Sequence, residues 1–271
     1  MIHKLAAVFI IFTLTGATVN TQTHTQREAP KEVRNRLFKQ ALADSGERDC
    51  IEKEEGGIRT AEENMSVEEV DLNRDGVSEY EVELSSPCTC GMVNCSIFVY
   101  RQSLTGYELI LDGAAGLGLE LLKTSSNGYA DVKIDARENA ASQSSTVYKF
   151  DGTRYREARS TLTRMDTGET KPASRRVQFR RGSSSTTIQG KVSLVLPDTL
   201  IVGARAGQTM TVQLTAPSKS VKFMLMTYKT TQSLADNTRS WTGTLPETGD
   251  YIILIDGDER GSTYSMTISI K

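Results

Sequence analysis

Histidine is the scarcest reactive residue in this chain of 271 residues, which contains only His3 and His24. His3 falls in the N-terminal leader and His24 in a polar tail, so neither suits a Ser-His-Asp centre, a Cys-His centre or a histidine zinc site. There is also no P-loop and no Gly-x-Gly-x-x-Gly after a predicted strand, which argues against a nucleotide cofactor. Carboxylate pairs could serve a glycosidase, but with 34 acidic residues most are solvated surface. We therefore expect a protein that is not an enzyme.

The chain has no large excess of either charge. Its 32 lysines and arginines nearly balance 34 aspartates and glutamates, for a net charge of -2. Nucleic-acid binders usually concentrate positive charge, so we expect no nucleic-acid partner. The basic pairs Arg175-Arg176 and Arg180-Arg181 are typical of a solvated strand edge that discourages aggregation. The chain length and the 38% hydrophobic content indicate an ordinary globular protein of one or two domains.

Long apolar runs are absent except near the N terminus. Lys4 precedes the short apolar stretch Leu5–Leu14 and the small residues that end at Ala17, which is the order of a secretory signal peptide. That stretch is too short to cross a bilayer comfortably, and no later segment is long and apolar enough, so we expect no membrane span. We assign residues 1–17 to a signal peptide and residues 18–30 to a disordered tail. The protein is therefore expected to be bacterial and periplasmic or secreted.

The chain has only four cysteines, all in its N-terminal half: Cys50, Cys88, Cys90 and Cys95. An even number of cysteines in an exported chain predicts disulfides, and three connectivities are possible. Cys88 and Cys90 alternate on what looks like one strand, so they are poorly placed to bond each other. Cys90 and Cys95 could close a small ring, leaving Cys50 for Cys88. A metal site is the weaker interpretation, because the spacing is not that of zinc ligands and no histidine lies nearby.

Residues 31–158 have the pattern of a β domain that begins with one helix. Pro30 suits a helix start, and Ser45-Gly46 suits its end. Between them, apolar residues recur on one helical face: Val33, Leu37, Phe38, Ala41 and Leu42. The acidic segment from Glu52 to Glu69 has little periodicity and is expected to be a loop.

Strand patterns return between Glu68 and Tyr155. Asp112-Gly113, Asn127-Gly128 and Asp151-Gly152 separate or follow the alternating segments, and such pairs are strong hairpin signals because both residues tolerate positive φ. We expect a β-meander. Residues 159–175, rich in Thr, Ser, Gly and charge, are expected to be a linker.

Residues 176–271 have the most regular pattern in the chain. Met210, Val212 and Leu214 alternate with polar residues, as in a half-buried strand. About eight such segments, separated by turn residues, predict an antiparallel β-sandwich. Trp241 and Tyr251 each sit in an apolar strand next to a turn, so core packing is favoured over a sugar-stacking role. The overall fold class is therefore mainly β, with a β-meander domain followed by a sandwich.

Four segments of this region carry a resemblance: Arg180–Ser185, Gly203–Met210, Trp241–Pro246 and Gly249–Tyr251. They resemble the bacterial β-sandwich domain of g-type lysozyme inhibitors, which is similar in turn to bacterial pre-peptidase C-terminal domains. The resemblance covers roughly the last 95 residues. It implies a non-enzymatic binding protein that inhibits a g-type lysozyme through loops of the sandwich.

Loops on a rigid scaffold are where such domains recognise partners. The candidate binding residues lie in or beside the predicted connections: Lys229, Asp236, Asp258 and Arg260. Lys229 or Arg260 would suit the catalytic carboxylates of a glycan-cleaving enzyme. The alternative for each residue is a solvated turn. The partner is expected to be a protein or a cell-wall glycan outside the cytoplasm.

A candidate calcium loop lies in the first domain. Side-chain oxygens at positions one, three, five and nine, glycine at six and a carbonyl at seven match the start of a calcium loop. The ligands would be Asp71, Asn73, Asp75, Val77 through its carbonyl, and Glu79. Val82 replaces the bidentate glutamate of a helix-loop-helix site, so the loop looks more like the Asp-x-Asn-x-Asp-Gly loops of secreted FG-GAP-type proteins. Bound calcium would stabilise an envelope adhesion or a carbohydrate-binding protein, the alternative function; an ion-free Asx-turn hairpin is the other interpretation.

Overall fold

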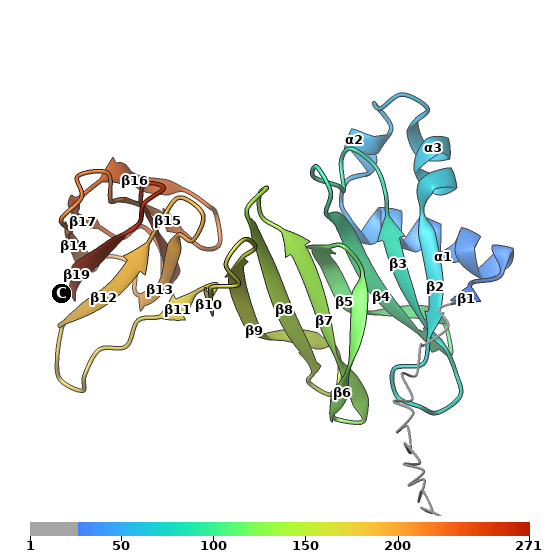
Figure 1. Ribbon diagram of the computed structural model, residues 1–271. Coiled ribbons are helices and arrows are strands. Elements are labelled where there is room, and N and C mark those ends of the chain that lie inside the picture. Colours follow the sequence, from blue (N-terminus) through green and yellow to red (C-terminus); the bar gives the residue numbers. More distant parts are fainter. Residues whose placement is uncertain (1–26) are drawn as a thin grey trace, which may run out of the picture.

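The computed structural model describes residues 27–271. The predicted signal peptide, residues 1–17, lies outside the described residues, as does most of the predicted tail. Figure 1 shows two domains side by side, joined near β10 and β11, with the C terminus on the side of the sandwich away from the N-terminal domain. No helix among residues 27–271 combines the length and the apolar character needed to cross a membrane.

The described chain is mainly β, as expected. Its elements are β1 (Arg27–Glu28), α1 (Lys31–Asp44), α2 (Arg48–Ile51), α3 (Gly57–Asn64), β2 (Ser66–Val70), β3 (Glu79–Leu84), β4 (Cys95–Ser103), β5 (Gly106–Gly116), β6 (Leu119–Ser126), β7 (Tyr129–Arg137), β8 (Ser142–Phe150), β9 (Tyr155–Arg164), β10 (Thr170–Pro172), β11 (Arg175–Arg176), β12 (Ser185–Val192), β13 (Asp198–Ala204), β14 (Thr209–Thr215), β15 (Lys222–Thr227), β16 (Ser233–Thr238), β17 (Ser240–Thr244), β18 (Gly249–Asp256) and β19 (Ser262–Ile270).

These strands form four sheets. The first sheet has the order β1-β2-β3-β4-β5 and the second β10-β9-β8-β7-β6, so each is a meander, as predicted. The third sheet, β11-β13-β18-β15-β16, and the fourth sheet, β12-β19-β14-β17, make up the C-terminal domain. All strand pairs are antiparallel except β11 with β13.

The predicted helix is present as α1. Its apolar face buries Leu37, Phe38, Ala41 and Leu42. These side chains pack against the first sheet in one hydrophobic cluster that includes Val82. Residues three and four positions apart share a helix face, so the spacing of the apolar residues was sufficient to predict this helix.

Two further helices correct the expectation of a single helix. α2 has four residues and α3 has eight, and β2 begins within the segment from Glu52 to Glu69 that we expected to be a loop. Helices this short are marginal on their own and depend on tertiary packing. Ala61 of α3 is buried in the cluster beneath the helices, and Ile58 packs against it. This packing could not be read from local periodicity.

The first sheet presents different residues on its two faces. Val67 of β2 and the β3 residues Tyr80, Val82 and Leu84 belong to the cluster shared with the helices. Strand residues alternate between faces, so Glu79, Glu81 and Glu83 point to the opposite side. There, Ile97 and Val99 of β4 pack with Ile134 of β7, which joins the first sheet to the second.

The three predicted hairpin signals have different outcomes. Asn127 and Gly128 both have positive φ, 48° and 85°, and connect β6 to β7. Asp151-Gly152 lies between β8 and β9, as expected. Asp112-Gly113 does not form a hairpin, because β5 runs through it. Gly113, at φ 56°, instead lies in an irregularity of the β4–β5 pairing, where a bulge needs the same backbone freedom.

The predicted linker, residues 159–175, is largely strand. It contains the end of β9, all of β10 and the first residue of β11. Thr163 pairs with Thr170, and Leu162 is buried. Polar composition was misleading here, because a strand that buries few side chains can be as rich in Thr and Ser as a linker. The predicted tail is likewise wrong for Arg27–Glu28, which pairs with β2, and for Ala29, which is buried.

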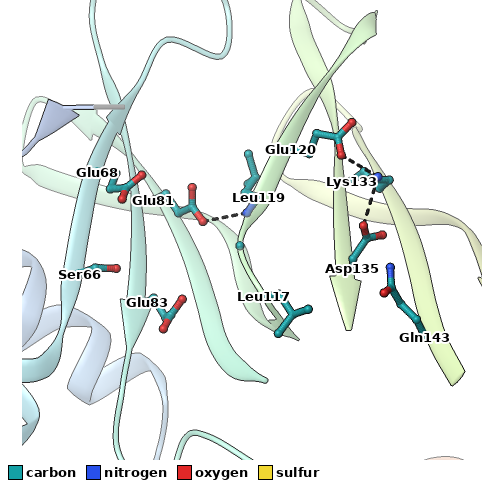
Figure 2. Close-up of a pocket in the computed structure, with 11 residues that line it drawn as sticks. Ser66, Glu68, Glu81, Glu83, Leu117, Leu119, Glu120, Lys133, Asp135 and Gln143 are labelled. Carbon is teal, nitrogen blue, oxygen red and sulfur yellow. Dashed lines mark hydrogen bonds and ion pairs between the residues drawn. The ribbon is translucent and has the colours of Figure 1, made fainter. Parts of the chain in front are cut away.

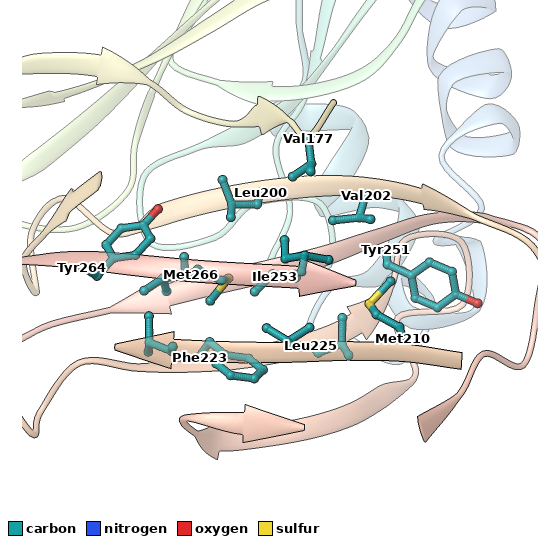
Figure 3. Close-up of a cluster of buried hydrophobic side chains, with 14 of the residues drawn as sticks. Val177, Leu200, Val202, Met210, Phe223, Leu225, Tyr251, Ile253, Tyr264 and Met266 are labelled. Carbon is teal, nitrogen blue, oxygen red and sulfur yellow. The ribbon is translucent and has the colours of Figure 1, made fainter. Parts of the chain in front are cut away.

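The C-terminal domain is a sandwich of the third and fourth sheets. Met210, Val212 and Leu214 of β14 point into its core, as their alternation predicted. Figure 3 shows Leu200, Ile253 and Phe223 of the third sheet in one cluster with Met266 of the fourth sheet. Tyr251 is fully buried there and Trp241 packs against the same cluster, so both aromatic residues belong to the core, as expected.

The four cysteines form two disulfides, as expected, and of the three possible connectivities the structure has Cys50–Cys88 with Cys90–Cys95. Cys50–Cys88 ties α2 to the segment between β3 and β4, and Cys90–Cys95 closes the small ring before β4. Cys88 lies in a turn rather than on a strand with Cys90. The described residues contain no free cysteine. Disulfides persist in oxidising compartments, which agrees with an extracytoplasmic location.

A buried carboxylate joins the two domains. Asp198 at the start of β13 is only 4% exposed. Its Oδ2 accepts hydrogen bonds from Arg175 at 2.5 Å and from the Tyr264 hydroxyl at 2.6 Å. Lys171 of β10 lies 3.7 Å from its Oδ1. Since β10 belongs to the second sheet and Asp198 to the third, the Lys171 contact links one domain to the other, whereas Arg175 and Tyr264 lie in the same domain as Asp198.

Candidate functional site

The structure does not bring the four predicted binding residues together. Lys229 follows β15 at the end of the sandwich where β18 begins, and the neighbouring Tyr228 amide donates to the Asp250 carbonyl at 2.9 Å. Asp258 and Arg260 follow the other end of β18. Asp236 is exposed on β16, at the edge of the third sheet. A charged residue on an edge strand discourages pairing with another chain, so Asp236 has a structural use where it lies.

Asp258 is occupied within its own loop region. Its Oδ1 accepts from the amides of Arg260 and Gly261, both at 3.1 Å. Its Oδ2 accepts from the hydroxyls of Ser220 at 2.8 Å and Ser218 at 3.1 Å. The Ser220 hydrogen bond is the main cause of the lowered pKa of this carboxyl. Asp258 therefore organises two loops, and we do not retain it as a contact residue.

One end of the sandwich gathers positive charge. We define the basic end as five exposed cationic residues: Arg180, Arg181, Arg205, Lys229 and Lys271. Strand pairing places them together, because β13 ends, β14 begins, β15 ends, β18 begins and β19 ends on this side. The loop with Arg180 and Arg181 arrives there as well, since the Ile270 amide donates to the Ser184 carbonyl at 2.8 Å.

The cations of the basic end are free of carboxylate partners within residues 27–271. None of the five takes part in a salt bridge in this part of the chain. The nearby Asp250 is already bound by Arg176, through contacts of 2.9 and 2.5 Å. Arg176 lowers the pKa of Asp250, which keeps this pair ionised. Tyr228, 59% exposed, lies beside Lys229 and adds an aromatic surface.

The sequence analysis found only part of this end. Lys229 was a candidate, whereas Arg180 and Arg181 were interpreted as a strand edge and lie in a loop. Arg205 was not a candidate; it lies in the connection between β13 and β14, two residues before Gly207 at φ 81°. That these loops converge could not, because convergence depends on strand order.

A second charged region lies in the N-terminal domain. Figure 2 shows a pocket of about 420 Å³ where the edge of the second sheet meets an uncovered part of the first sheet. We call it the acidic corner. Its carboxylates come from β2, β3, β6 and β7: Glu68, Glu81, Glu83, Glu120 and Asp135.

Three of the five carboxylates of the acidic corner are tied to the fold by hydrogen bonds or ion pairs. Glu81 accepts from the Leu119 amide at 3.0 Å. Lys133 lies 2.6 Å from Glu120 and 3.3 Å from Asp135, and its pKa is raised, mainly by the Glu120 hydrogen bond. Burial, reinforced by Glu68, raises the pKa of Glu83. The corner can attract a cation. From the sequence, these acids were interpreted as solvated surface. The absence of enzymatic activity stays a prediction.

The candidate calcium loop has its own internal hydrogen bonds. The Asp71 carboxylate accepts from the amides of Arg74 at 2.7 Å and Gly76 at 3.2 Å. Asp75 accepts from the Val77 amide at 2.7 Å and from the Asn73 side chain at 2.8 Å. Arg74 and Gly76 have positive φ, 60° and 82°. These are the features of an Asx-turn connection between two strands.

The carboxylates of Asp71, Asp75 and Glu79 do not form a close three-ligand cluster in this conformation. Glu79 accepts from the Leu72 amide at 2.8 Å, and burial raises its pKa to about 7, with contributions from Asp75 and Asp71. Within residues 27–271, only Cys50, Glu54 and Cys88 bring three potential ligand atoms close together, and these cysteines are bonded to each other. Calcium binding at the loop stays a prediction.

Comparison with known proteins gives partial likenesses. No family model matches the chain, and no curated protein matches it. Among solved structures, the g-type lysozyme inhibitor PliG of Aeromonas hydrophila, described as periplasmic, is 25% identical, with a TM-score of 0.33 over 35% of this chain and 94% of its own. The Salmonella Typhimurium PliG is 23% identical, with a TM-score of 0.30 over 36% of this chain and 97% of its own. A pre-peptidase C-terminal domain of a Bacillus anthracis collagenase is 14% identical, with a TM-score of 0.28 over 36% of this chain and 94% of its own.

Proposed function

We propose that this protein binds a protein partner outside the cytoplasm and inhibits a g-type lysozyme through the basic end of its C-terminal sandwich. The observation that carries the proposal is the convergence of five exposed, unpaired cations from three connections and from Lys271, which follows β19. The resemblance of the sequence of residues 176–271 to g-type lysozyme inhibitors supports the choice of partner. The two disulfides support a role outside the cytoplasm.

The basic end fits the chemistry of such a target. Enzymes that cleave glycosidic bonds act through carboxyl groups in a cleft. Loops held by a packed sandwich can present cations to that cleft with little loss of conformational freedom on binding. Positive charge at the tip also steers association with an acidic cleft.

The opposite end of the sandwich fits less well. Arg260 lies there beside Glu259, close to Asp256 and Asp258, so its charge has acidic neighbours. Asp258 already accepts four hydrogen bonds. Lys171 of the N-terminal domain contacts the Leu196 carbonyl at 3.2 Å on this side, which places the first domain near it. We therefore assign recognition to Lys229 and its neighbours and not to Arg260.

Charge reversal tests this assignment. The assay is lysis of purified peptidoglycan by a goose-type lysozyme at increasing concentrations of the mature protein. Lys229→Glu and Arg205→Glu should each weaken inhibition about tenfold or more, since each replaces an attraction by a repulsion. Lys219→Glu, an exposed lysine at the opposite end, is the matched control and should inhibit like the wild type. Equal inhibition by all three variants would exclude the basic end as the contact surface.

A further inference from the structure

We propose that the groove between the two domains is a binding site for a neutral glycan, a function that does not depend on lysozyme inhibition. The groove has a volume of about 430 Å³. One wall belongs to the second sheet and is rich in hydroxyls: Ser142, Ser144, Thr146 and Ser160. The facing wall belongs to the C-terminal domain and is mostly apolar: Leu194, Pro197 and Leu254.

The topology explains why a hydroxyl-bearing wall is present. Ser144 and Thr146 of β8 lie directly opposite Ala136 and Ile134 of β7, so all four share one face of the second sheet. Farther along β8, Phe150 of the same sheet packs with the first sheet in a hydrophobic cluster. At the Ser142 end, that face meets the C-terminal domain instead. Apolar side chains at these positions would pack directly against the C-terminal domain, but β8 has three hydroxyl-bearing residues there.

One hydroxyl in this wall has no partner. Ser142 is 1% exposed, and its Oγ is the single buried side-chain nitrogen or oxygen atom of the described residues that lacks a hydrogen bond. By contrast, the hydroxyls of Thr146 and Ser160 bond each other at 2.9 Å. Leaving a buried hydroxyl unpaired destabilises the fold, so such a group in a groove points to a ligand or an ordered water.

The composition of the groove selects a class of ligand. No lysine or arginine lines it, and Glu138 is its only charged residue, so an anion would be repelled and a metal ion would lack ligands. A volume of about 430 Å³ with one hydroxyl-bearing wall does not suit an acyl chain. A pyranose has hydroxyls on its edges and an apolar face of C–H groups, which match the two walls. Pockets of this size, apolar with a few polar groups, are typical of domain interfaces.

A peptide fits the groove less well than a sugar. Extended peptides are usually bound through the backbone of a free strand edge. Here β8 is paired on both sides, and β9 is paired with β8 and, over Thr161–Thr163, with β10. The Ser160 carbonyl also accepts from the Ala173 amide, so the backbone groups beside the groove are used. The second sheet instead presents side-chain hydroxyls to the groove, and these match the hydroxyls of a glycan.

The groove is held open by the contacts at the domain junction. The Lys171 ammonium donates to the carbonyls of Leu196 at 3.2 Å and Lys191 at 3.4 Å and lies near Asp198. Lys171 belongs to β10 and Leu196 to the connection that carries Leu194 and Pro197, while Lys191 and Asp198 belong to β12 and β13, which flank that connection. The two walls are therefore fixed relative to each other, and a ligand needs little rearrangement to enter.

Titration of the isotope-labelled mature chain with chitobiose and cellobiose, followed by amide NMR, tests the proposal. At tens of millimolar sugar, we expect saturable shifts at Ser142, Ser144 and Leu254 for at least one disaccharide. Ser142→Ala should weaken binding about tenfold without lowering the melting temperature, because it removes a buried hydroxyl that has no partner in the protein. Ser240→Ala, at an exposed position on β17, is the control and should bind like the wild type.

Three outcomes would overturn the proposal. The first is no saturable shift with either disaccharide. The second is equal binding by the Ser142→Ala variant and the wild type, which would leave an ordered water as the hydroxyl's partner. The third is saturation by a neutral tripeptide such as trialanine and by neither sugar, which would reassign the groove to peptides.

Discussion

The basic end and the acidic corner hold their charges in opposite ways. The cations of the basic end lie on loops, are exposed and have no carboxylate partner among residues 27–271. In the acidic corner, Glu81 is held by a backbone amide, and Glu120 and Asp135 share Lys133. Charges fixed by the framework contribute to stability, whereas charges left free on loops can serve a partner. Mutations at the two regions should therefore separate stability from inhibition.

The largest expected effect on stability comes from the most enclosed carboxylate. Asp198→Ala removes the partner of Arg175, Lys171 and Tyr264 and leaves partly buried cations uncompensated. The free energy of unfolding should fall by about 3 kcal/mol, measured by denaturant titration. Asp236→Ala, on an exposed edge strand, is the control and should change it by less than about 0.5 kcal/mol. A loss equal to that of the control would show that the domain junction does not depend on this carboxylate.

The acidic corner should also respond through stability. Glu81→Ala leaves the Leu119 amide without its acceptor and should cost about 2 kcal/mol of unfolding free energy. Lys229→Ala, at the basic end, should cost less than about 0.5 kcal/mol. Thermal melts of the two variants compare the regions directly. If Lys229→Ala were the more destabilising, the distinction between framework charges and free charges would be wrong.

If calcium binds the Asp71–Glu79 loop, the charges of this loop contribute to stability, like the fixed charges of the acidic corner. At tenfold the dissociation constant, a bound ion raises the free energy of unfolding by about 1.4 kcal/mol. Calorimetric titration of the mature protein should then give a one-to-one isotherm, and a chelator should lower the melting temperature. Asp75→Asn should weaken both effects. Absence of heat and of any melting shift would leave the ion-free hairpin as the correct interpretation.

The smallest effect concerns pH. The pKa of Glu83 is raised in the fold by burial and by Glu68, so the folded state favours the protonated form. Its stabilising contribution is complete below the ordinary carboxyl pKa and is lost as pH rises through the raised value. In the wild type, this loss lowers the free energy of unfolding as pH rises above the ordinary carboxyl range. The Glu83→Gln variant cannot ionise at this position, so its free energy of unfolding should fall less over the same range. The difference should be less than about 1 kcal/mol, because the side chain is partly exposed. Melting curves across that range are the check, and an unchanged slope would contradict it.

The fold was predictable where one face of an element is apolar. α1 and β14 followed from the spacing of Leu37 to Leu42 and of Met210 to Leu214. Prediction failed where burial is sparse, as in β9 and β10, or where a short helix depends on distant packing, as in α3. The hairpin predicted at Asp112-Gly113 is absent for another reason: a bulge and a hairpin both use a glycine at positive φ, so the sequence does not distinguish them.

The sites were less predictable than the fold. Lys229 and Arg260 look equivalent as loop cations in the sequence, yet β18 places them at opposite ends of the sandwich. Glu81 and Glu83 look like the solvent face of a strand, yet the second sheet partly covers them. Ser142 carries no signal in the sequence, because its isolation arises only when two domains meet.

Inhibition of a goose-type lysozyme by the unaltered mature protein is the most direct test of the central claim. The measurement is the residual rate of peptidoglycan lysis as the protein is added from substoichiometric amounts to a large excess. Our account predicts that lysis falls progressively and stops near equimolar protein, and that added salt weakens the inhibition because charge contributes to binding. Full lytic activity at a large excess of the protein would contradict it.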